Sequence, residues 1–421
     1  MNKKQAIPIF AVVFTNVLGG SIILPILPLL AEQGFGATAF QATAIATAFF
    51  AAQFFAAPIM GRISDRTGRR PLLLISQVGT VIAFVIFIFA AEIGVWIDSL
   101  GVAIGMGGGL LTLYIARTLD GITGGNISIA QAYISDVSDT ESRTKALGFI
   151  GVAYGLGIVF GPIIGSFTAP IGLRVPFIVA AILTIVSLLL TYFFLQESLP
   201  PEKRSHRQPE RVARLDAAQL RAVTPILLVV FAYMMTFSVL VSTFSLFANR
   251  VIFPEIDEVS QVVWYVGFIL SLFGIGSAAS QAAVLPALLK RLNEREIILS
   301  GLVSLMVGFA GMAVAESVWA VVGLVLFLAY GMGILQPCLQ ALLTFHGNDQ
   351  TNGRLLGLFE SVRSLAFIIA PLWAGGVFDL VSPHAPYAVA AGLVLVGFLI
   401  AARAIRQPSP AAHPIKGVLS S

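Results

Sequence analysis

The sequence predicts an all-α integral membrane protein with twelve transmembrane helices, arranged as two pseudo-symmetric bundles of six. Three observations support this fold class. Hydrophobic residues make up 57% of the 421 residues and charged residues only 11%, whereas soluble domains carry about 25% charged residues. Uncharged apolar runs long enough to cross a bilayer recur along the chain, and a polar segment divides them into two sets. A single water-soluble core could not bury this much apolar surface, so lipid must surround most of the chain.

The apolar runs define the individual helices. A bilayer core of about 30 Å requires about 20 apolar residues in a helix. The first run is too long for the apolar core of a signal peptide, about 7–15 residues, so we expect an uncleaved helix. The runs fall near 7–31, 37–60, 71–91, 101–116 with a continuation to 135, 144–168 and 175–195, and then near 222–249, 260–289, 297–315, 317–345, 355–378 and 385–402.

The polar segment between the two sets contains three prolines and six basic residues. Its composition cannot be buried, so it is expected to link two domains, with a short surface helix over 216–221. The sequence therefore predicts an N-terminal bundle over 1–195, a cytoplasmic linker over 196–221, a C-terminal bundle over 222–405 and a cytoplasmic tail over 406–421.

The basic residues indicate the orientation of the chain. With twelve helices, 21 of the 25 lysines and arginines lie on the side shared by both termini and the linker. An excess of Lys and Arg marks cytoplasmic loops, so both termini are expected in the cytoplasm of a multi-pass plasma-membrane protein. The same pattern explains the net charge of +4, and no nucleic-acid partner is expected.

An internal repeat relates the two sets of helices. Gly148 precedes Pro162 by the same interval as Gly357 precedes Pro371, within the fifth and eleventh expected helices. A proline also precedes a basic loop after the second and the eighth helices. Two parallel six-helix halves with a substrate site at the bilayer midplane form one of the known transporter architectures.

The connection between the second and third helices carries an ordered motif. It reads G-x-x-x-D-x-x-G-R-R, a spacing that a generic basic loop does not explain. Its residues are Gly61, Asp65, Arg66, Gly68, Arg69 and Arg70. At this point the chain resembles the major facilitator superfamily, whose hallmark loop lies between the same two helices.

The resemblance implies a conformational latch on the cytoplasmic side. In relatives, this loop joins a charged pattern at the end of the fourth helix, matched here by Asp136 and Arg143. Asp65 and Arg69 would then hold the cytoplasmic side closed in the outward-facing state. The alternative is a set of solvated loop charges, each worth less than about 1 kcal/mol.

The fifth helix resembles the antiporter motif of drug-exporting branches of the superfamily. The matching residues are Gly148, Gly157, Gly161, Pro162 and Gly165, and Ser166 replaces the last glycine of the motif. The alternative interpretation is ordinary close packing, because glycines at helical spacing let a neighbouring helix approach and a proline bends its own helix.

Two charges lie inside the fourth helix. Arg117 and Asp120 are three residues apart, so they share one helix face and can form an ion pair. A charge in the membrane costs at least about 2.5–3.5 kcal/mol on insertion scales and marks a functional site by default. We expect Asp120 to bind a proton when Arg117 moves away; a fixed structural pair is the alternative.

The resemblance is strongest to the tetracycline-exporter-like branch of drug/proton antiporters, although one feature departs from it. Those exporters carry acidic residues inside helices 1, 3 and 9, where this chain has Asn16 in helix 1 and no acid in the other two. Proton coupling is therefore expected at Asp120 or at Glu360, which lies three residues before Arg363. A structural pair between Glu360 and Arg363 is the alternative.

The resemblance also implies a substrate cavity lined by helices 1, 4, 7 and 10. A mainly apolar cavity with few polar groups suits amphipathic compounds. The candidate substrate-binding residues are Asn16, Arg117, Asp120, Tyr233, Phe237, Gln336 and Gln340.

The favoured function is proton-coupled efflux, or antiport, of drug-like or amphipathic molecules by alternating access. An importer or uniporter of a small metabolite is the alternative. An integral-membrane enzyme or sensor is disfavoured: the sequence lacks HExxH, Walker and CxxC motifs and a GxSxG in the required context. No cofactor and no metal are expected, and the single cysteine, Cys338, forms no disulfide framework. The expected partners are the bilayer, a small-molecule substrate and protons, and a monomer is sufficient.

Overall fold

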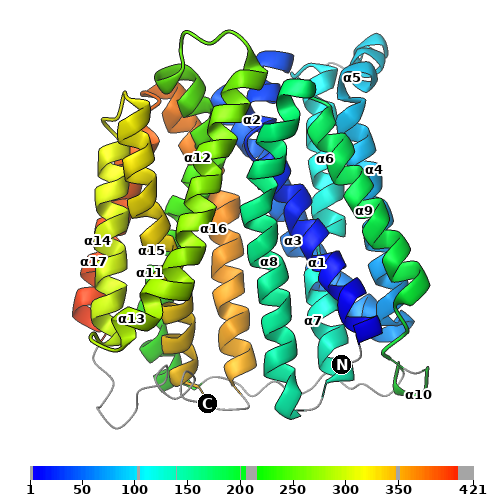
Figure 1. The fold of residues 1–421 in the computed structure, drawn as a ribbon, viewed down its shortest axis with the longest axis vertical. Helices are drawn as coiled ribbons and strands as arrows, with labels where there is room; N and C mark the ends of the chain where they lie inside the picture. Colours follow the sequence, from blue (N-terminus) through cyan, green and yellow to red (C-terminus); the bar gives the residue numbers. More distant parts are fainter. Residues whose placement is uncertain are drawn as a thin grey trace. The chain divides into compact units, whose positions relative to one another are not determined.

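A computed structural model of the chain describes residues 3–101, 105–138, 140–199, 201–204, 216–347 and 351–405. The side chains of 3–6, 140–149, 201 and 203 are outside this description. The predicted tail over 406–421, residues 200 and 205–215 of the predicted linker, and the expected roles of Arg143 and Gly148 therefore lie outside this description. All regular structure within the described ranges is helical, which confirms the predicted all-α class (Figure 1).

The chain divides into two compact units. The first comprises residues 1–208 and 255–268, and the second 209–254 and 269–421. The helices of the first unit are α1 (Lys3–Ile23), α2 (Leu27–Leu29), η1 (Leu30–Gly34), α3 (Ala39–Thr67), α4 (Arg69–Ile88), α5 (Ala90–Ser99), α6 (Gly108–Thr123), α7 (Asn126–Val137), α8 (Thr140–Thr168), η2 (Ala169–Ile171), α9 (Val175–Phe194) and α10 (Pro201–Arg204).

The helices of the second unit are α11 (Ala217–Phe247), η3 (Ala248–Ile252), α12 (Val259–Ala279), η4 (Ser280–Val284), α13 (Leu285–Leu289), α14 (Glu294–Met312), α15 (Val318–Phe345), α16 (Asn352–Leu380) and α17 (Ala385–Ala404). The first half of α12, up to Phe268, groups with the first unit. The two units share one irregularity. A π-helical turn ends the first span of each, as η1 directly after α2 in the first unit and as η3 directly after α11 in the second.

Ten helices among the described residues are long and apolar enough to cross a membrane, or eleven if the bent pair at the N-terminus is one span. That pair, residues 7–23 and 27–34, is bent by 42° next to Pro25. The predicted run over 101–135 is divided into α6 and α7 at Gly124 and Gly125, and neither piece alone reaches the 20 or so residues that a span needs. α6 and α7 together occupy the run in which the remaining crossing was predicted.

The predicted linker is shorter than its composition indicates. The Asp216 side chain accepts a hydrogen bond from Gln219 N at 2.6 Å and caps α11, so residues 217–221 are the first turns of a long helix and not a separate surface helix. This capping box satisfies N–H groups that the helix itself leaves unpaired.

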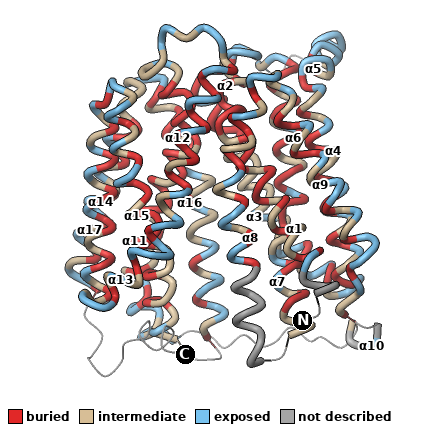
Figure 2. The backbone as a smooth tube through the Cα atoms, in the orientation of Figure 1, coloured by how far each residue is buried: buried red, intermediate tan, exposed pale blue. Residues whose placement is uncertain are grey.

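The outer faces of the helices are apolar, as a lipid environment requires. Figure 2 shows buried and exposed positions alternating along most of the long helices, and the exposed positions include Phe55, Ile75, Phe193 and Trp319. In water, so many large exposed apolar side chains would promote aggregation. Their distribution over all the long helices is that of a membrane protein, in which lipid covers this surface.

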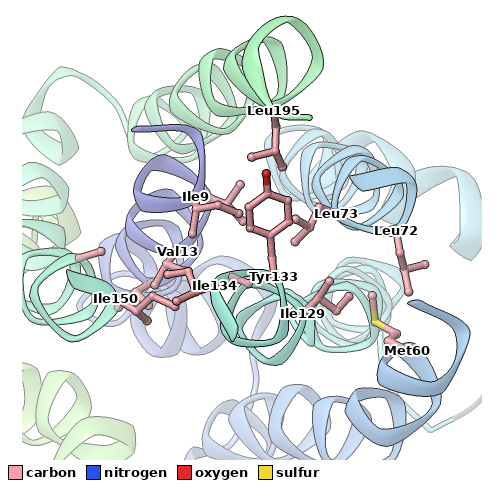
Figure 3. Close-up of a cluster of buried hydrophobic side chains, with 14 residues drawn as sticks. Ile9, Val13, Met60, Leu72, Leu73, Ile129, Tyr133, Ile134, Ile150 and Leu195 are labelled. Atoms are coloured by element: carbon pink, nitrogen blue, oxygen red, sulfur yellow. The ribbon is translucent and has the colours of Figure 1, made fainter. Parts of the chain in front are cut away.

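A buried cluster around Tyr133 fixes one end of the first unit. Figure 3 shows the Tyr133 ring of α7 between Ile9 of α1 and Leu73 of α4, with its hydroxyl pointing toward Leu195. The hydroxyl donates to the Gln196 carbonyl at 2.9 Å. The residues that follow α9 are thereby fastened to the same end of the unit as the junction between α3 and α4.

Candidate functional site

The guanidinium of Arg69 is the centre of a charged network in the first unit. Its Nη2 donates to Asp65 Oδ1 at 2.6 Å, its Nε donates to Asp136 Oδ2 at 3.1 Å, and its Nη1 donates to Ser64 Oγ. The side chains of Arg69 and Asp136 are 3% and 8% exposed, whereas that of Asp65 is 42% exposed. The planar fork of an arginine suits several acceptors held at fixed positions, which a lysine ammonium cannot reproduce.

The motif that contains Arg69 is a junction between two helices rather than an open loop. α3 continues to Thr67 and α4 begins at Arg69, so Gly68 alone separates them. Gly68 has a φ of +109°, and an added Cβ would collide with the Glu197 carboxylate. The position therefore requires glycine both for its backbone conformation and for the close approach of an acid.

Glu197 caps α4 from a distant part of the sequence. Its Oε1 accepts from Arg69 N at 2.9 Å, and its Oε2 accepts from Arg70 N at 3.2 Å. A carboxylate at a helix N-terminus pairs with unsatisfied N–H groups and with the positive end of the helix dipole. Next to it, Ser198 Oγ donates to Asp136 Oδ2 at 3.3 Å. We call Ser64, Asp65, Arg69, Asp136, Glu197 and Ser198 the Arg69 network.

The other residues of the predicted latch that the structure describes are not part of the Arg69 network. Arg70 Nη2 donates to the Tyr192 carbonyl at 2.6 Å, and its guanidinium lies over the Tyr192 ring. Arg66 is exposed, and an added Cβ at Gly61 would meet no atom within 4 Å. The structure thus brings Asp65, Arg69 and Asp136 together and leaves Arg66 and Gly61 at the edge.

A second charged group lies inside the first unit. Arg117 Nη1 donates to Asp120 Oδ2 at 3.0 Å within α6, and both side chains are only 6% exposed. The Arg117 guanidinium lies 4.8 Å from the centre of the Phe49 ring of α3, a cation–π contact. Arg117 Nε is buried without a hydrogen-bond partner among the described residues. The pair predicted from the sequence spacing is therefore formed, and it is shielded from solvent.

The glycines of the predicted antiporter motif face α1. An added Cβ would meet Val17 at Gly157, Ser21 at Gly161, and the Ile22 carbonyl at Gly165. These contacts include backbone atoms of α1, so the two helices approach too closely for any side chain to lie between them. Close packing of α8 against α1 accounts for all three glycines.

In the second unit, Tyr233 and Phe237 lie one turn apart on α11, while Glu360 and Arg363 form an ion pair at 2.7 Å on α16. Phe237 also contacts Phe273 of α12 and Phe367 of α16.

The remaining substrate candidates, Asn16 on α1 and Gln336 and Gln340 on α15, are half-buried. Within the described ranges, no three His, Cys, Asp or Glu side chains gather in an arrangement that could hold a metal ion.

Sequence reasoning missed Glu197, Phe49, Phe273 and Phe367. Glu197 follows an apolar run and precedes two prolines, so its position indicates one of several charged linker residues. The only signal for a specific role was an acidic residue directly after a predicted span. The three phenylalanines are among 31 in the chain, and nothing in their local sequence separates them from lipid-facing ones.

Helical units with apolar outer faces and an ion pair buried within a span are typical of a multi-pass membrane protein. The chain belongs to the Major Facilitator Superfamily, whose family model matches residues 9–371 and, in a second match, 265–420. This confirms the superfamily predicted from the junction between the second and third helices.

The similar proteins include tetracycline resistance proteins. The class C protein of Escherichia coli is 32% identical over 90% of this chain and 90% of its own length. The class D protein of Salmonella ordonez is 30% identical over 98% of this chain and 99% of its own length. Among solved structures, the human organic anion transporter TETRAN matches with a TM-score of 0.66 at 23% identity, covering 95% of this chain and 99% of that one; this likeness shows the fold.

Proposed function

We propose that this protein is a proton-coupled exporter of amphipathic, drug-like molecules that works by alternating access. The observation that carries the proposal is the Arg117–Asp120 pair, buried in an apolar segment with an N–O distance of 3.0 Å. Intramembrane ionisable residues mark ion or proton pathways by default. The tetracycline resistance relatives support an export direction.

The geometry of the pair suggests how a proton could be exchanged. Water does not surround either side chain, so the Asp120 carboxylate depends on Arg117 for its compensation. If Arg117 is drawn away, by a substrate group or by movement of α3 with Phe49, the uncompensated carboxylate takes up a proton. Glu360 is the weaker candidate because its side chain is 49% exposed, whereas that of Asp120 is only 6% exposed.

The Arg69 network is proposed as the conformational latch of the transport cycle. Its buried Arg69–Asp136 contact would stabilise one state, and the more exposed Asp65 would exchange partners most readily. We also propose that both termini face the cytoplasm across the plasma membrane, because of the distribution of lysines and arginines, and that a monomer is the working unit.

The decisive test measures proton movement in inside-out vesicles. A pH gradient is imposed, a panel of amphipathic cations, anions and neutral compounds is added, and a pH-sensitive dye reports the gradient. Compounds that are exported should collapse the gradient in the wild type but not in Asp120→Asn. The matched control is Glu92→Gln, which removes an exposed acid on α5 and should behave as the wild type. Full gradient collapse with Asp120→Asn would refute Asp120 as the coupling residue.

Import or uniport of a small metabolite remains the second candidate. The observation that favours it is that the Arg117–Asp120 pair is closed in this structure, as a permanent structural pair would be. On this reading, no compound should dissipate the pH gradient, and Asp120→Asn and Arg117→Gln should lower protein stability without changing any dependence on protons.

A further inference from the structure

The second residue of α4 is an arginine that reaches the end of α9. Arg70 Nη2 donates to the Tyr192 carbonyl at 2.6 Å, and Tyr192 lies two residues before the end of α9. Arg70 Nε is buried without a hydrogen-bond partner among the described residues. A guanidinium has five N–H donors and a full positive charge, and a carbonyl at the C-terminal end of a helix offsets only part of that charge.

The second unit repeats this arrangement at equivalent positions. Arg295 is the second residue of α14, and its Nη2 donates to the carbonyl of Ala402, two residues before the end of α17. Arg295 Nε is likewise buried without a partner in the described part of the chain. The residue before the arginine differs, because Arg69 precedes Arg70 whereas Glu294 precedes Arg295. The two units therefore share the arginine and its carbonyl partner even though the charge beside it is reversed.

The described residues do not neutralise either arginine. Arg70 and Arg295 are half-buried, and among the described residues neither guanidinium forms an ion pair. Glu197, the acid next to Arg70, accepts a hydrogen bond from its backbone N and not from its side chain. The other arginines that are buried or half-buried in the described ranges all form ion pairs, namely Arg69, Arg117, Arg204 and Arg363. A cation removed from water requires a compensating charge, so an anion from outside the chain would complete both positions.

Exposed apolar side chains extend along the spans from each arginine. All four helices that meet at the two arginines are long and apolar enough to cross a membrane. Their exposed apolar residues stand at the same intervals from the arginine and from its carbonyl partner in both units: Val78, Val186 and Leu189 in the first, and Val303, Val396 and Leu399 in the second. Such side chains on a span face the acyl chains of the bilayer. Each arginine therefore lies where a lipid-covered surface reaches the end of its helices.

The depth and the local charge agree with a lipid headgroup. In the proposed orientation, both arginines stand at the cytoplasmic ends of their helices, where the phosphates of the inner leaflet lie. A second, exposed arginine stands four residues earlier in each unit, as Arg66 and as Arg291. Basic sites between transmembrane helices on the cytoplasmic side bind anionic headgroups, and the planar guanidinium matches two oxygens of a phosphate at once.

We propose that Arg70 and Arg295 each bind the phosphate of an anionic phospholipid, one lipid in each unit. The exposed edge of the guanidinium donates to the phosphate oxygens while Nη2 keeps the helix carbonyl. The acyl chains lie along the exposed apolar side chains of the same two helices. The bound lipid thus joins the start of α4 to the end of α9, and the start of α14 to the end of α17. The inference uses the proposed orientation only to name the cytoplasmic leaflet, and it does not depend on proton coupling.

Native mass spectrometry of the purified, detergent-solubilised protein tests the proposal, because it counts the lipids that stay bound. The protein is titrated with dioleoyl phosphatidylglycerol or with dioleoyl phosphatidylcholine, whose headgroup has no net charge. The wild type should bind two phosphatidylglycerol molecules at least about fivefold more tightly than phosphatidylcholine. Arg70→Gln and Arg295→Gln should each lose one of these two sites, and the double variant should lose both. Glycerophosphoglycerol, the headgroup without acyl chains, should not displace the lipid at equal concentration.

Arg62→Gln and Arg403→Gln are the matched controls, because each removes an exposed arginine near one of the sites, and both variants should keep two bound lipids. Equal losses in these controls would show diffuse attraction only and would overturn the proposal. It is also overturned if the wild type does not distinguish the two lipids, or if the soluble headgroup displaces phosphatidylglycerol.

The lysine variants decide the outcome if a glutamine variant does not fold. Arg70→Lys and Arg295→Lys keep the positive charge, so they should retain a preference for phosphatidylglycerol. A folded lysine variant without this preference would show that the arginine serves only to hold the helix carbonyl, and would refute the lipid site. Failure of the vesicle assay with normal lipid binding would instead refute proton-coupled export and leave both lipid sites standing.

Discussion

Replacing Arg69 by lysine tests whether the fork geometry, rather than positive charge, holds the Arg69 network together. The arginine makes three hydrogen bonds, to Ser64, Asp65 and Asp136. A lysine keeps the charge but cannot reach all three acceptors from one position. The contact that matters most is with Asp136, because its side chain is only 8% exposed.

The size of the effect follows from the exposure of each partner. A hydrogen bond to a charged group contributes about 1.5–3 kcal/mol, whereas an exposed pair such as that with Asp65 contributes about 0.2–1 kcal/mol. We therefore expect Arg69→Lys to lower the free energy of unfolding by about 2–4 kcal/mol. Arg69→Ala should cost about 3–5 kcal/mol, because it leaves a buried carboxylate without its cation.

Thermal unfolding of the purified protein in detergent measures this loss. At about 2–4 °C per kcal/mol for a unit of this size, Arg69→Lys should lower Tm by about 5 °C or more. The matched control is Arg66→Lys, one turn earlier in the same motif, where the side chain is exposed and Tm should not move. Equal Tm values for the two lysine variants would refute the idea that the guanidinium geometry of Arg69 stabilises the network. Positive charge alone would then be sufficient at this junction.

The other predictions concern packing, capping and orientation. Gly161→Ala should cost about 1–3 kcal/mol by forcing α8 away from the α1 backbone, whereas Gly155→Ala, where an added Cβ meets no atom within 4 Å, should be neutral in the same unfolding assay. Glu197→Gln should lose about 1–2 kcal/mol of capping at α4; Glu202→Gln, which changes an exposed acid nearby, should lose nothing, and equal losses would contradict the capping role. A reporter fused after Ser421 should give a cytoplasmic signal, and an external signal would exclude the proposed orientation.

Local relations along a helix were predictable from the sequence. Arg117 and Asp120 pair because residues three apart share a helix face, and the same rule pairs Glu360 with Arg363. The apolar runs could also be identified in the sequence, because each crossing of the lipid requires about 20 apolar residues. Where the count differs, local breaks at Pro25 and at Gly124–Gly125 account for it.

Relations across the unit were predictable only through resemblance, or not at all. The motif resemblance predicted that Asp136 belongs with Arg69, but no signal predicted that Glu197, 128 residues away along the chain, caps α4. Likewise, nothing in the sequence distinguishes the phenylalanines around Phe237 from those that face lipid.

By itself, the sequence determined that lipid surrounds most of the chain, where the helices lie along it, and which ion pairs form within them. These depend on composition and on a period of 3.6 residues, which are properties of one segment at a time. Only the tertiary structure decided which helices meet and which polar groups are left unsatisfied, Arg70 Nε and Arg295 Nε among them. Lipid-facing and protein-facing surfaces of a membrane helix are both apolar, so hydrophobicity does not select the packing partner, whereas close van der Waals contact and buried hydrogen bonds do.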